Sequence, residues 1–243
     1  MMNGTKAALH RTNRLLGALE PNDFLWLEPY LEIVDLPRGR VIYEIGEPIH
    51  YTYFPHDAII SLITVLQSGG AVEVAIFGRE AAVGFVSALV TRQSFGRYIT
   101  QAPGTASRLP VERLNDAFAN RANMRHILFR FTEAFLAQTL QTVACNAVHT
   151  VEARFCRVIL STRDRIDKDE IPLTHEALAD MLGVQRSTVS SVTSALQRAG
   201  LIHQGRGTIR ITDRDGIEEM ACECYQTIRQ SFEKLLPGAL SSS

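Results

Sequence analysis

The N-terminal half of the chain has short runs in which apolar and polar positions alternate, whereas the C-terminal half repeats its apolar positions at helical spacing. Six runs between residues 31 and 109 alternate or are rich in β-branched residues: 31–36, 40–45, 51–54, 59–66, 72–77 and 105–109. Turn residues such as Pro37-Arg38-Gly39 separate them. Many short strands at this spacing predict an antiparallel sandwich or jelly roll, preceded by a short helix over residues 21–30.

The pattern after these strands predicts helices, first over residues 110–119 and then over residues 123–148, which contain neither Gly nor Pro. Apolar residues of the second segment cover far more than one stripe: Met124, Ile127, Leu128, Phe129, Phe131, Phe135, Leu136, Leu140, Val143, Ala144 and Ala147. A helix of this length spans about 37 Å, and a helix that is apolar on most sides must be covered on most sides. We expect the barrel to cover one side and the same helix of a second copy to cover the other. The alternative is a central helix wedged between two domains of one chain.

Residues 173–196, LTHEALADMLGVQRSTVSSVTSAL, form two amphipathic stretches that meet at Gly183. Glycine suits such a turn because it adopts positive φ without strain. The apolar residues at helical spacing are Leu178, Met181, Leu182, Val189, Val192 and Leu196. The outward positions of the second stretch are short or hydrogen-bonding: Gln185, Arg186, Ser187, Ser190, Ser191 and Ser194. Such a surface can enter a major groove, where an arginine can bind guanine, so the pattern predicts a helix-turn-helix rather than a plain helical hairpin.

A predicted β-hairpin follows this pair of helices. Gly200 stands at the expected end of the second helix, and residues 201–203 and 208–211 have strand character around the turn 204–207. Between residues 181 and 212 there are four arginines and no acidic residue, although the formal net charge of the chain is -1. Release of counterions from DNA needs only a local basic face. The hairpin is therefore interpreted as the wing of a DNA-binding domain.

The composition adds few further possibilities. With 243 residues, 46% apolar and 21% charged, the chain is long enough for two domains. The N-terminal segment is polar, and no run approaches the roughly 20 apolar residues of a membrane span, so we expect a cytoplasmic protein with no membrane partner. No nucleophile and base pair, phosphate loop or pair of carboxylates at catalytic spacing is evident. Enzyme activity is not expected.

The four cysteines are interpreted as thiols rather than as a disulfide framework. Cys222 and Cys224 form C-x-C rather than C-x-x-C, and no Cys or His cluster is evident elsewhere. We therefore predict no zinc or iron–sulfur site, no cofactor, and buried packing for Cys145 and Cys156.

The predicted order of a jelly roll, a long helix, a hinge at His149-Thr150 and a winged helix-turn-helix resembles the Crp/Fnr superfamily of bacterial transcription regulators. The resemblance covers nearly the whole chain. LTHEALADMLGVQRSTVSSVTSALQRAGLI followed by GRG is similar to the DNA-binding signature of that family, and PRGRVIYEIGEPI resembles its opening β-hairpin. The resemblance implies an α+β fold with three parts. These are a cyclic-nucleotide-binding-like sensor domain (1–122), a dimerisation helix (123–148) and a winged helix-turn-helix DNA-binding domain (149–243).

The resemblance also implies roles for individual residues. Gln185, Arg186 and Ser191 match positions from which the family reads bases, with Ser187 and Ser190 beside them. Thr174, His175 and Thr188 match phosphate contacts, and the wing residue Arg206 is expected to join them. Ser191 stands where many members have Arg, and Ser187 where Glu is frequent. The operator of the best-known members is therefore not the one to expect.

The effector site matches the family less well. Cyclic-nucleotide-binding members hold the ribose with a Gly-Glu pair and the phosphate with Arg followed by Ser or Thr. Here Gly84 is followed by Phe85 and Arg97 by Tyr98, while an alternative register uses Gly78-Arg79-Glu80. Candidate effector residues are thus Arg79, Glu80, Gly84, Phe85, Arg97 and Tyr98. A cyclic nucleotide is disfavoured, and the effector is left open. The cysteine cluster of oxygen-sensing members is not matched either, because the first cysteine is Cys145.

The function expected is that of a homodimeric regulator that binds double-stranded DNA and is modulated through its barrel, with RNA polymerase as a further partner if it activates. Two alternatives stay open. In one, the barrel is only a dimer scaffold. In the other, the protein is a cupin-like metal-binding jelly roll using His50 and His56, although the cupin fold needs a closer His-x-His spacing.

Overall fold

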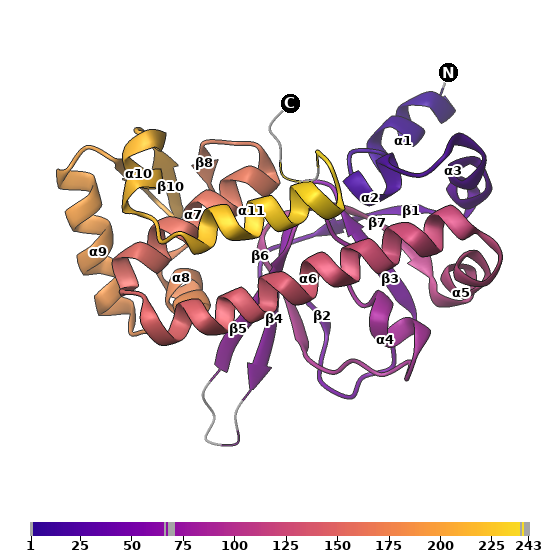
Figure 1. The fold of residues 1–243 in the computed structure, drawn as a ribbon, viewed down its shortest axis with the longest axis horizontal. Coiled ribbons are helices and arrows are strands. Elements are labelled where there is room, and N and C mark those ends of the chain that lie inside the picture. The colour runs from indigo at the N-terminus through magenta and orange to yellow at the C-terminus, as the bar shows by residue number, and fades with distance from the viewer. Residues whose placement is uncertain (1, 66, 68–70, 239, 241–243) are drawn as a thin grey trace.

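A β-barrel and a helical C-terminal domain lie at opposite ends of the molecule, and the long helix α6 (Ala122–Val148) runs across both (Figure 1). The computed structural model describes residues 2–65, 67, 71–238 and 240. Four short helical segments precede the barrel: α1 (Met2–His10), α2 (Arg14–Gly17), α3 (Pro21–Leu27) and the 3-10 helix η1 (Glu28–Tyr30). The single helix predicted over residues 21–30 is therefore an α-helix continued by a 3-10 turn.

Two antiparallel sheets form the barrel. One has the order β1-β7-β3, from β1 (Glu32–Leu36), β7 (Gly104–Pro110) and β3 (Tyr51–Pro55). The other has the order β2-β6-β4-β5, from β2 (Val41–Tyr43), β6 (Arg97–Ala102), β4 (Ile59–Val65) and β5 (Ala71–Phe77). The jelly-roll prediction thus found six of these seven strands. Strand β6 was not predicted, because Arg97-Tyr98 was interpreted as a possible ligand motif. In the structure Tyr98 of β6 pairs with Leu62 of β4.

Three helices follow the barrel: α5 (Val111–Asn120), α6 and α7 (Val151–Ile166), with the short α4 (Phe85–Leu89) inserted earlier. Helix α6 buries one side against the barrel and against α11 (Cys224–Leu235), which lies alongside it in Figure 1. Its opposite side is apolar yet exposed at Phe129, Leu136, Leu140, Val143 and Val148. Helix α6 therefore lies between the two domains of one chain, and it also has an exposed apolar stripe that a second copy could cover.

The C-terminal domain contains a three-stranded sheet of order β8-β10-β9, formed by β8 (Glu170–Ile171), β10 (Thr208–Ile211) and β9 (Ile202–Gly205). Helices α8 (His175–Leu182), α9 (Arg186–Arg198) and α10 (Arg214–Met220) pack around it. Ala221 is extended and separates α10 from α11. Leu240 is buried in the barrel core, and residues 239 and 241–243 lie outside the described part.

The two domains share a hydrophobic core. Ile59, Ile76 and Ala102 of the barrel belong to the same buried cluster as the apolar residues of α7, α8 and α9. The C-terminal domain is therefore docked on the barrel rather than tethered to it. Within the described residues, no helix is long and apolar enough to cross a membrane.

Candidate DNA-binding surface and interdomain contacts

The local sequence explains how α8 and α9 are arranged. Thr174 caps α8, and its hydroxyl accepts a hydrogen bond of 3.1 Å from the backbone N–H of Ala177. Gly183 ends α8 with φ of 63° and ψ of 40°, the left-handed conformation expected from the sequence. Val189, Val192 and Leu196 are at most 4% exposed, so the predicted inner face of α9 is confirmed as buried.

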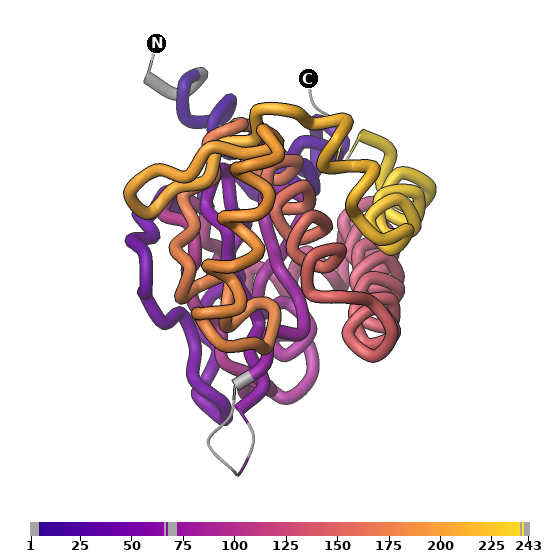
Figure 2. The backbone as a smooth tube through the Cα atoms, turned by 90° about the vertical axis from the view of Figure 1, so that its left-hand side faces the viewer, coloured from indigo at the N-terminus to yellow at the C-terminus, as the bar shows by residue number. Residues whose placement is uncertain are grey.

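The outer face of α9 lies on the surface at one end of the molecule, beside the β9–β10 hairpin (Figure 2). The exposed side chains at its start are those of Gln185, Arg186, Ser187 and Ser191. The Ser191 hydroxyl donates to the backbone carbonyl of Ser187 at 3.1 Å, which keeps its side chain close to the helix. Most side chains on this face are therefore short, and Arg186 is the one long charged side chain near the N-terminus of α9. This shape suits approach to a major groove.

His175 and Ser190 are half-buried and join the two helices. His175 Nδ1 lies 3.0 Å from Ser190 Oγ, which in turn donates to the Arg186 carbonyl at 3.1 Å. Burial, with the charge of Arg186, lowers the pKa of His175. His175 therefore contacts α9 through Nδ1, whereas its Nε2 has no hydrogen-bond partner among the described residues. Thr188, also half-buried, lies in the first turn of α9.

The hairpin after α9 places Arg206 at its exposed tip, between paired residues Gly205 and Thr208. Arg210 on the next strand is paired with Glu170 of β8 at 3.0 Å. Residues 181–212 contain no acidic residue, but Glu170, from outside that segment, partly neutralises the positive charge of Arg210. Arg186 and Arg206 are the exposed arginines nearest the start of α9 and the hairpin turn.

The structure divides the six candidate effector residues into two groups. Arg79 and Glu80 face the C-terminal domain: Arg79 pairs with Asp167 at 3.3 Å, and Glu80 pairs with Arg165 at 2.8 Å. They do not join Arg97 or Tyr98, so the alternative register that would place them in one ligand site is wrong. Gly84 is followed by Phe85 rather than by the Glu that would bind a ribose. It stands at the start of α4, with φ of 82°.

Gly84, Phe85 and Tyr98 do lie together, around a small apolar pocket inside the barrel. Six further residues complete its aromatic and apolar lining: Phe77, Ala82, Val86, Phe95, Phe131 and Phe135. Phe131 and Phe135 belong to α6, and the Phe135 ring stacks on Phe77 with centroids 5.2 Å apart. Arg97 stays outside and pairs with Glu44 at 3.2 Å. The pocket is thus lined by rings from the barrel and from the long helix.

A buried polar network joins the barrel, α6 and α7. The Arg165 side chain is 1% exposed and donates to Glu80 at 2.8 Å, to Gln138 Oε1 at 2.6 Å and to the Ser161 carbonyl at 2.9 Å. Gln138 Nε2 reaches the Ile76 carbonyl of β5 at 3.4 Å. Sequence patterns gave no signal for this network because its members lie on four separate segments.

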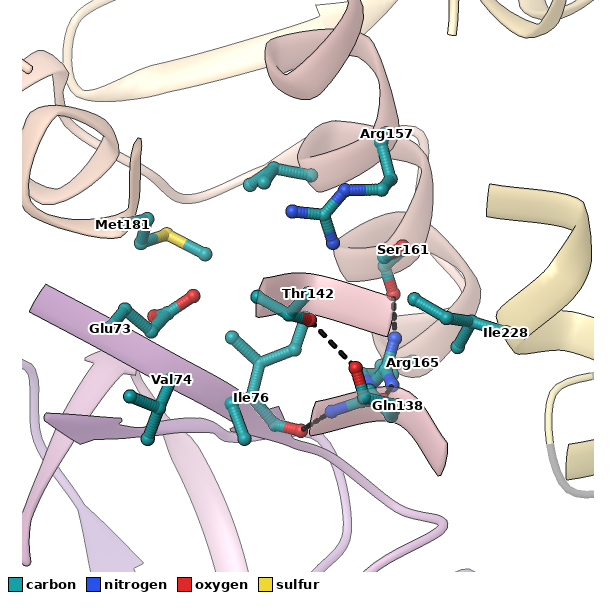
Figure 3. Close-up of a pocket in the computed structure, with 12 residues that line it drawn as sticks. Glu73, Val74, Ile76, Gln138, Thr142, Arg157, Ser161, Arg165, Met181 and Ile228 are labelled. Carbon is teal, nitrogen blue, oxygen red and sulfur yellow. Dashed lines mark hydrogen bonds between the residues drawn. The ribbon is translucent and has the colours of Figure 1, made fainter. Parts of the chain in front are cut away.

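Beside this network lies a small, partly open cleft. Glu73 of β5 and Arg157 of α7 lie on opposite sides of it, with Met181 of α8 also in its wall (Figure 3). Burial raises the pKa of Glu73 to about 8, against which the Ser61 hydroxyl and the charge of Arg157 act only partly. Glu73 therefore carries a proton at neutral pH in the docked arrangement.

The histidines proposed for a cupin-type site are not brought together. His56 Nε2 lies 2.7 Å from Ser107 Oγ and its Nδ1 lies 3.0 Å from Thr105 Oγ1, while His50 is exposed. Burial lowers the pKa of His56 to about 4. His56 is thus a neutral, hydrogen-bonded histidine of the barrel. A different set of residues, Cys145, His149, Cys222 and Cys224, does converge, although their segments are far apart in the sequence.

Comparison with known proteins agrees with this arrangement. Residues 153–220 match the Crp-like helix-turn-helix domain family. The chain is 24% identical over 191 residues to the global nitrogen regulator of Synechococcus elongatus, covering 74% of this chain and 86% of that protein. Among solved structures, FixK2 from Bradyrhizobium japonicum is similar with a TM-score of 0.68 and 16% identity, covering 79% of this chain and 98% of that one. A CRP-family transcriptional regulator from Thermus thermophilus is similar with a TM-score of 0.66 and 20% identity, covering 77% and 96%.

The fold and the exposed α9 define a winged helix-turn-helix DNA-binding protein with an N-terminal jelly-roll barrel. Residues 153–220 thus carry a Crp-like helix-turn-helix domain, and most of the chain is similar to regulators of the Crp/Fnr type.

Proposed function

We propose that this regulator acts as a homodimer that reads a roughly palindromic operator, with the two α9 helices in successive major grooves about 34 Å apart. The observation that carries the proposal is the apolar stripe of α6. Phe129, Leu136, Leu140 and Val143 are 55–63% exposed and follow one another at spacings of seven, four and three residues. This is the spacing of a coiled-coil seam, in which a second copy of the helix covers the stripe.

The dimer is tested with Leu140→Arg. A twofold axis along the seam would bring the two introduced charges close together in an apolar contact, so we expect the variant to sediment as a monomer where the parent sediments as a dimer. Leu25→Arg is a matched control, because Leu25 is 62% exposed and Leu140 63%, but Leu25 lies on α3. Equal masses for both variants and the parent in analytical ultracentrifugation would remove the seam as the interface.

We further propose that Gln185, Arg186 and Ser191, with Ser187 and Ser190 beside them, read base edges. In this proposal Thr174, His175, Thr188 and Arg206 fix the position of the domain on the phosphates. Arg186→Ala should weaken binding to the selected operator by roughly 1–3 kcal/mol and relax the preference at one base pair. Ser194→Ala, an exposed position about two turns further along α9, is the control. Operator selection with both variants measures this, and an unchanged base preference for Arg186→Ala would contradict the assignment.

The barrel is proposed to control DNA binding through its apolar pocket. The pocket has no room for a metabolite while its rings are packed as they are, so a ligand there would have to displace Phe131 and Phe135 of α6 and would thereby alter the helix that carries the proposed dimer seam. The lining favours a hydrophobic or aromatic metabolite over a cyclic nucleotide, whose phosphate requires a cation. A thermal-shift screen of such metabolites and cyclic nucleotides, repeated with Tyr98→Ala, tests it. Failure of every compound would favour the barrel as a dimer scaffold, and activation would additionally require contact with RNA polymerase in a transcription assay.

A further inference from the structure

Three cysteines and one histidine meet where α6 ends. Their candidate ligand atoms, one each from Cys145, His149, Cys222 and Cys224, all lie within 4.8 Å of one another. Cys145 and His149 are four residues apart at the end of α6, and the His149 N–H donates to the Cys145 carbonyl at 3.1 Å. Cys222 and Cys224 come from the extended link between α10 and α11 and from the first residue of α11. The break that separates these two helices is what brings the C-x-C pair to α6.

The distances fit one tetrahedral metal ion. Cys145 Sγ lies 3.5 Å from Cys222 Sγ, and Cys224 Sγ lies 3.6 Å from His149 Nδ1. Ligands at zinc–sulfur distances of about 2.3 Å around a tetrahedral centre are separated by about 3.8 Å. An iron–sulfur cluster needs a wider set, because its ligands bind different iron atoms. The cluster therefore has the size of a mononuclear site.

Polar residues that surround the four candidate ligands contact them as the neighbours of metal ligands usually do. His149 Nε2 lies 3.1 Å from a carboxylate oxygen of Glu223, which orients the ring so that Nδ1 faces Cys224. Gln141 Nε2 donates to Cys224 Sγ at 3.0 Å, a contact that stabilises a thiolate. The charge of Arg157 acts on Cys145 in the same direction. It would also offset the single negative charge of a zinc ion bound by three thiolates and a neutral imidazole.

Burial is consistent with a structural site. The three cysteines are at most 6% exposed, and the His149 side chain is 20% exposed, which leaves one side open for entry. A divalent ion that binds thiolates displaces their protons.

We propose that Cys145, His149, Cys222 and Cys224 form a structural Zn²⁺ site. The ion clamps the end of α6 to the start of α11 and so holds the hinge between the long helix and the DNA-binding domain in one geometry. Binding releases the remaining thiol protons to solvent and needs no oxidant or reductant.

The test measures zinc in the full-length, untagged protein, purified under reducing, anaerobic conditions and given one equivalent of ZnCl₂ before gel filtration. We expect about one zinc per chain in the parent and a loss of most of it in Cys222→Ala and Cys224→Ala. Cys156→Ala is the matched control, because Cys156 is equally buried but outside the cluster. It should retain the metal. A strong chelator should lower the melting temperature of the parent and of Cys156→Ala, but not of Cys222→Ala.

Cobalt keeps the proposal testable if the alanine variants fail to fold. Titration of the apo parent with Co²⁺ should give the thiolate charge-transfer and tetrahedral ligand-field bands of a site with three sulfur ligands, and Zn²⁺ should displace it. No bound zinc in the reduced parent, equal zinc in the parent and Cys222→Ala, or an octahedral cobalt spectrum would each overturn the assignment. So would a Cys145–Cys222 disulfide that forms under these conditions and excludes the ion.

Discussion

Replacing Arg165 with Met should destabilise the protein more than any surface arginine substitution. The side chain is 1% exposed and makes an ion pair with Glu80, itself 1% exposed, together with hydrogen bonds to Gln138 and Ser161. Methionine has similar length but leaves the Glu80 carboxylate buried without its cation. Glu80 Oε1 would keep its hydrogen bond of 3.2 Å from the backbone N–H of Gly78, whereas Oε2 has no hydrogen-bond partner among the described residues. Removing one partner of a buried pair costs about 3–5 kcal/mol.

The loss is measured by urea unfolding, followed by far-UV circular dichroism and by the fluorescence of Trp26, the one tryptophan of the chain. Glu80→Gln combined with Arg165→Met should recover part of the loss, because the buried charge is then removed. Arg113→Met is the control, since Arg113 is 42% exposed and pairs with Asp116 at 3.2 Å; it should change stability by less than about 1 kcal/mol. A loss below about 1 kcal/mol for Arg165→Met, equal to that of the control, would refute the reasoning.

Three other outcomes are expected. Arg206→Ala should weaken binding to all DNA sequences alike and reduce the slope of log affinity against log salt by about one, measured by fluorescence anisotropy. Glu73 has a folded pKa of about 8, above its ordinary value of 4.5, so its contribution to stability is full below pH 4.5 and is lost as the pH rises through 8. Glu73→Gln should therefore abolish this decline, which amounts to at most about 5 kcal/mol, in melting curves recorded from pH 5 to pH 9. Gly183→Ala should cost about 1 kcal/mol in urea unfolding although no atom lies within 4 Å of the added Cβ, because φ is 63°; Gly183→Asn should cost less.

Local patterns predicted most elements because they depend on neighbouring residues. The turn at Gly183, the cap at Thr174 and the buried face of α9 follow from side-chain size, hydroxyl placement and helical spacing within a few residues. Such reasoning does not locate the break between α10 and α11. Beyond Ala221, Cys222 and Cys224 join Cys145 of α6 in a buried cluster, a contact between segments far apart in the sequence.

The candidate DNA-binding surface could be outlined residue by residue, whereas the candidate effector site could not. Positions on the outer face of one helix share that face by geometry alone, so Gln185, Arg186 and Ser191 were found together. A ligand pocket joins residues from several strands and a helix. Only the fold shows that Gly84, Phe85 and Tyr98 meet Phe131, and that Glu80 turns away to Arg165.

The sequence by itself determined the order of barrel, long helix and winged domain, because periodicity, caps and turn residues act over short distances along the chain. The tertiary structure decided which distant charges and thiols meet. Arg165 and Glu80 are 85 residues apart, and Cys145 and Cys222 are 77 apart. Such pairs leave no periodic signal, because each forms only when two separately folded surfaces dock and exclude water from the groups between them.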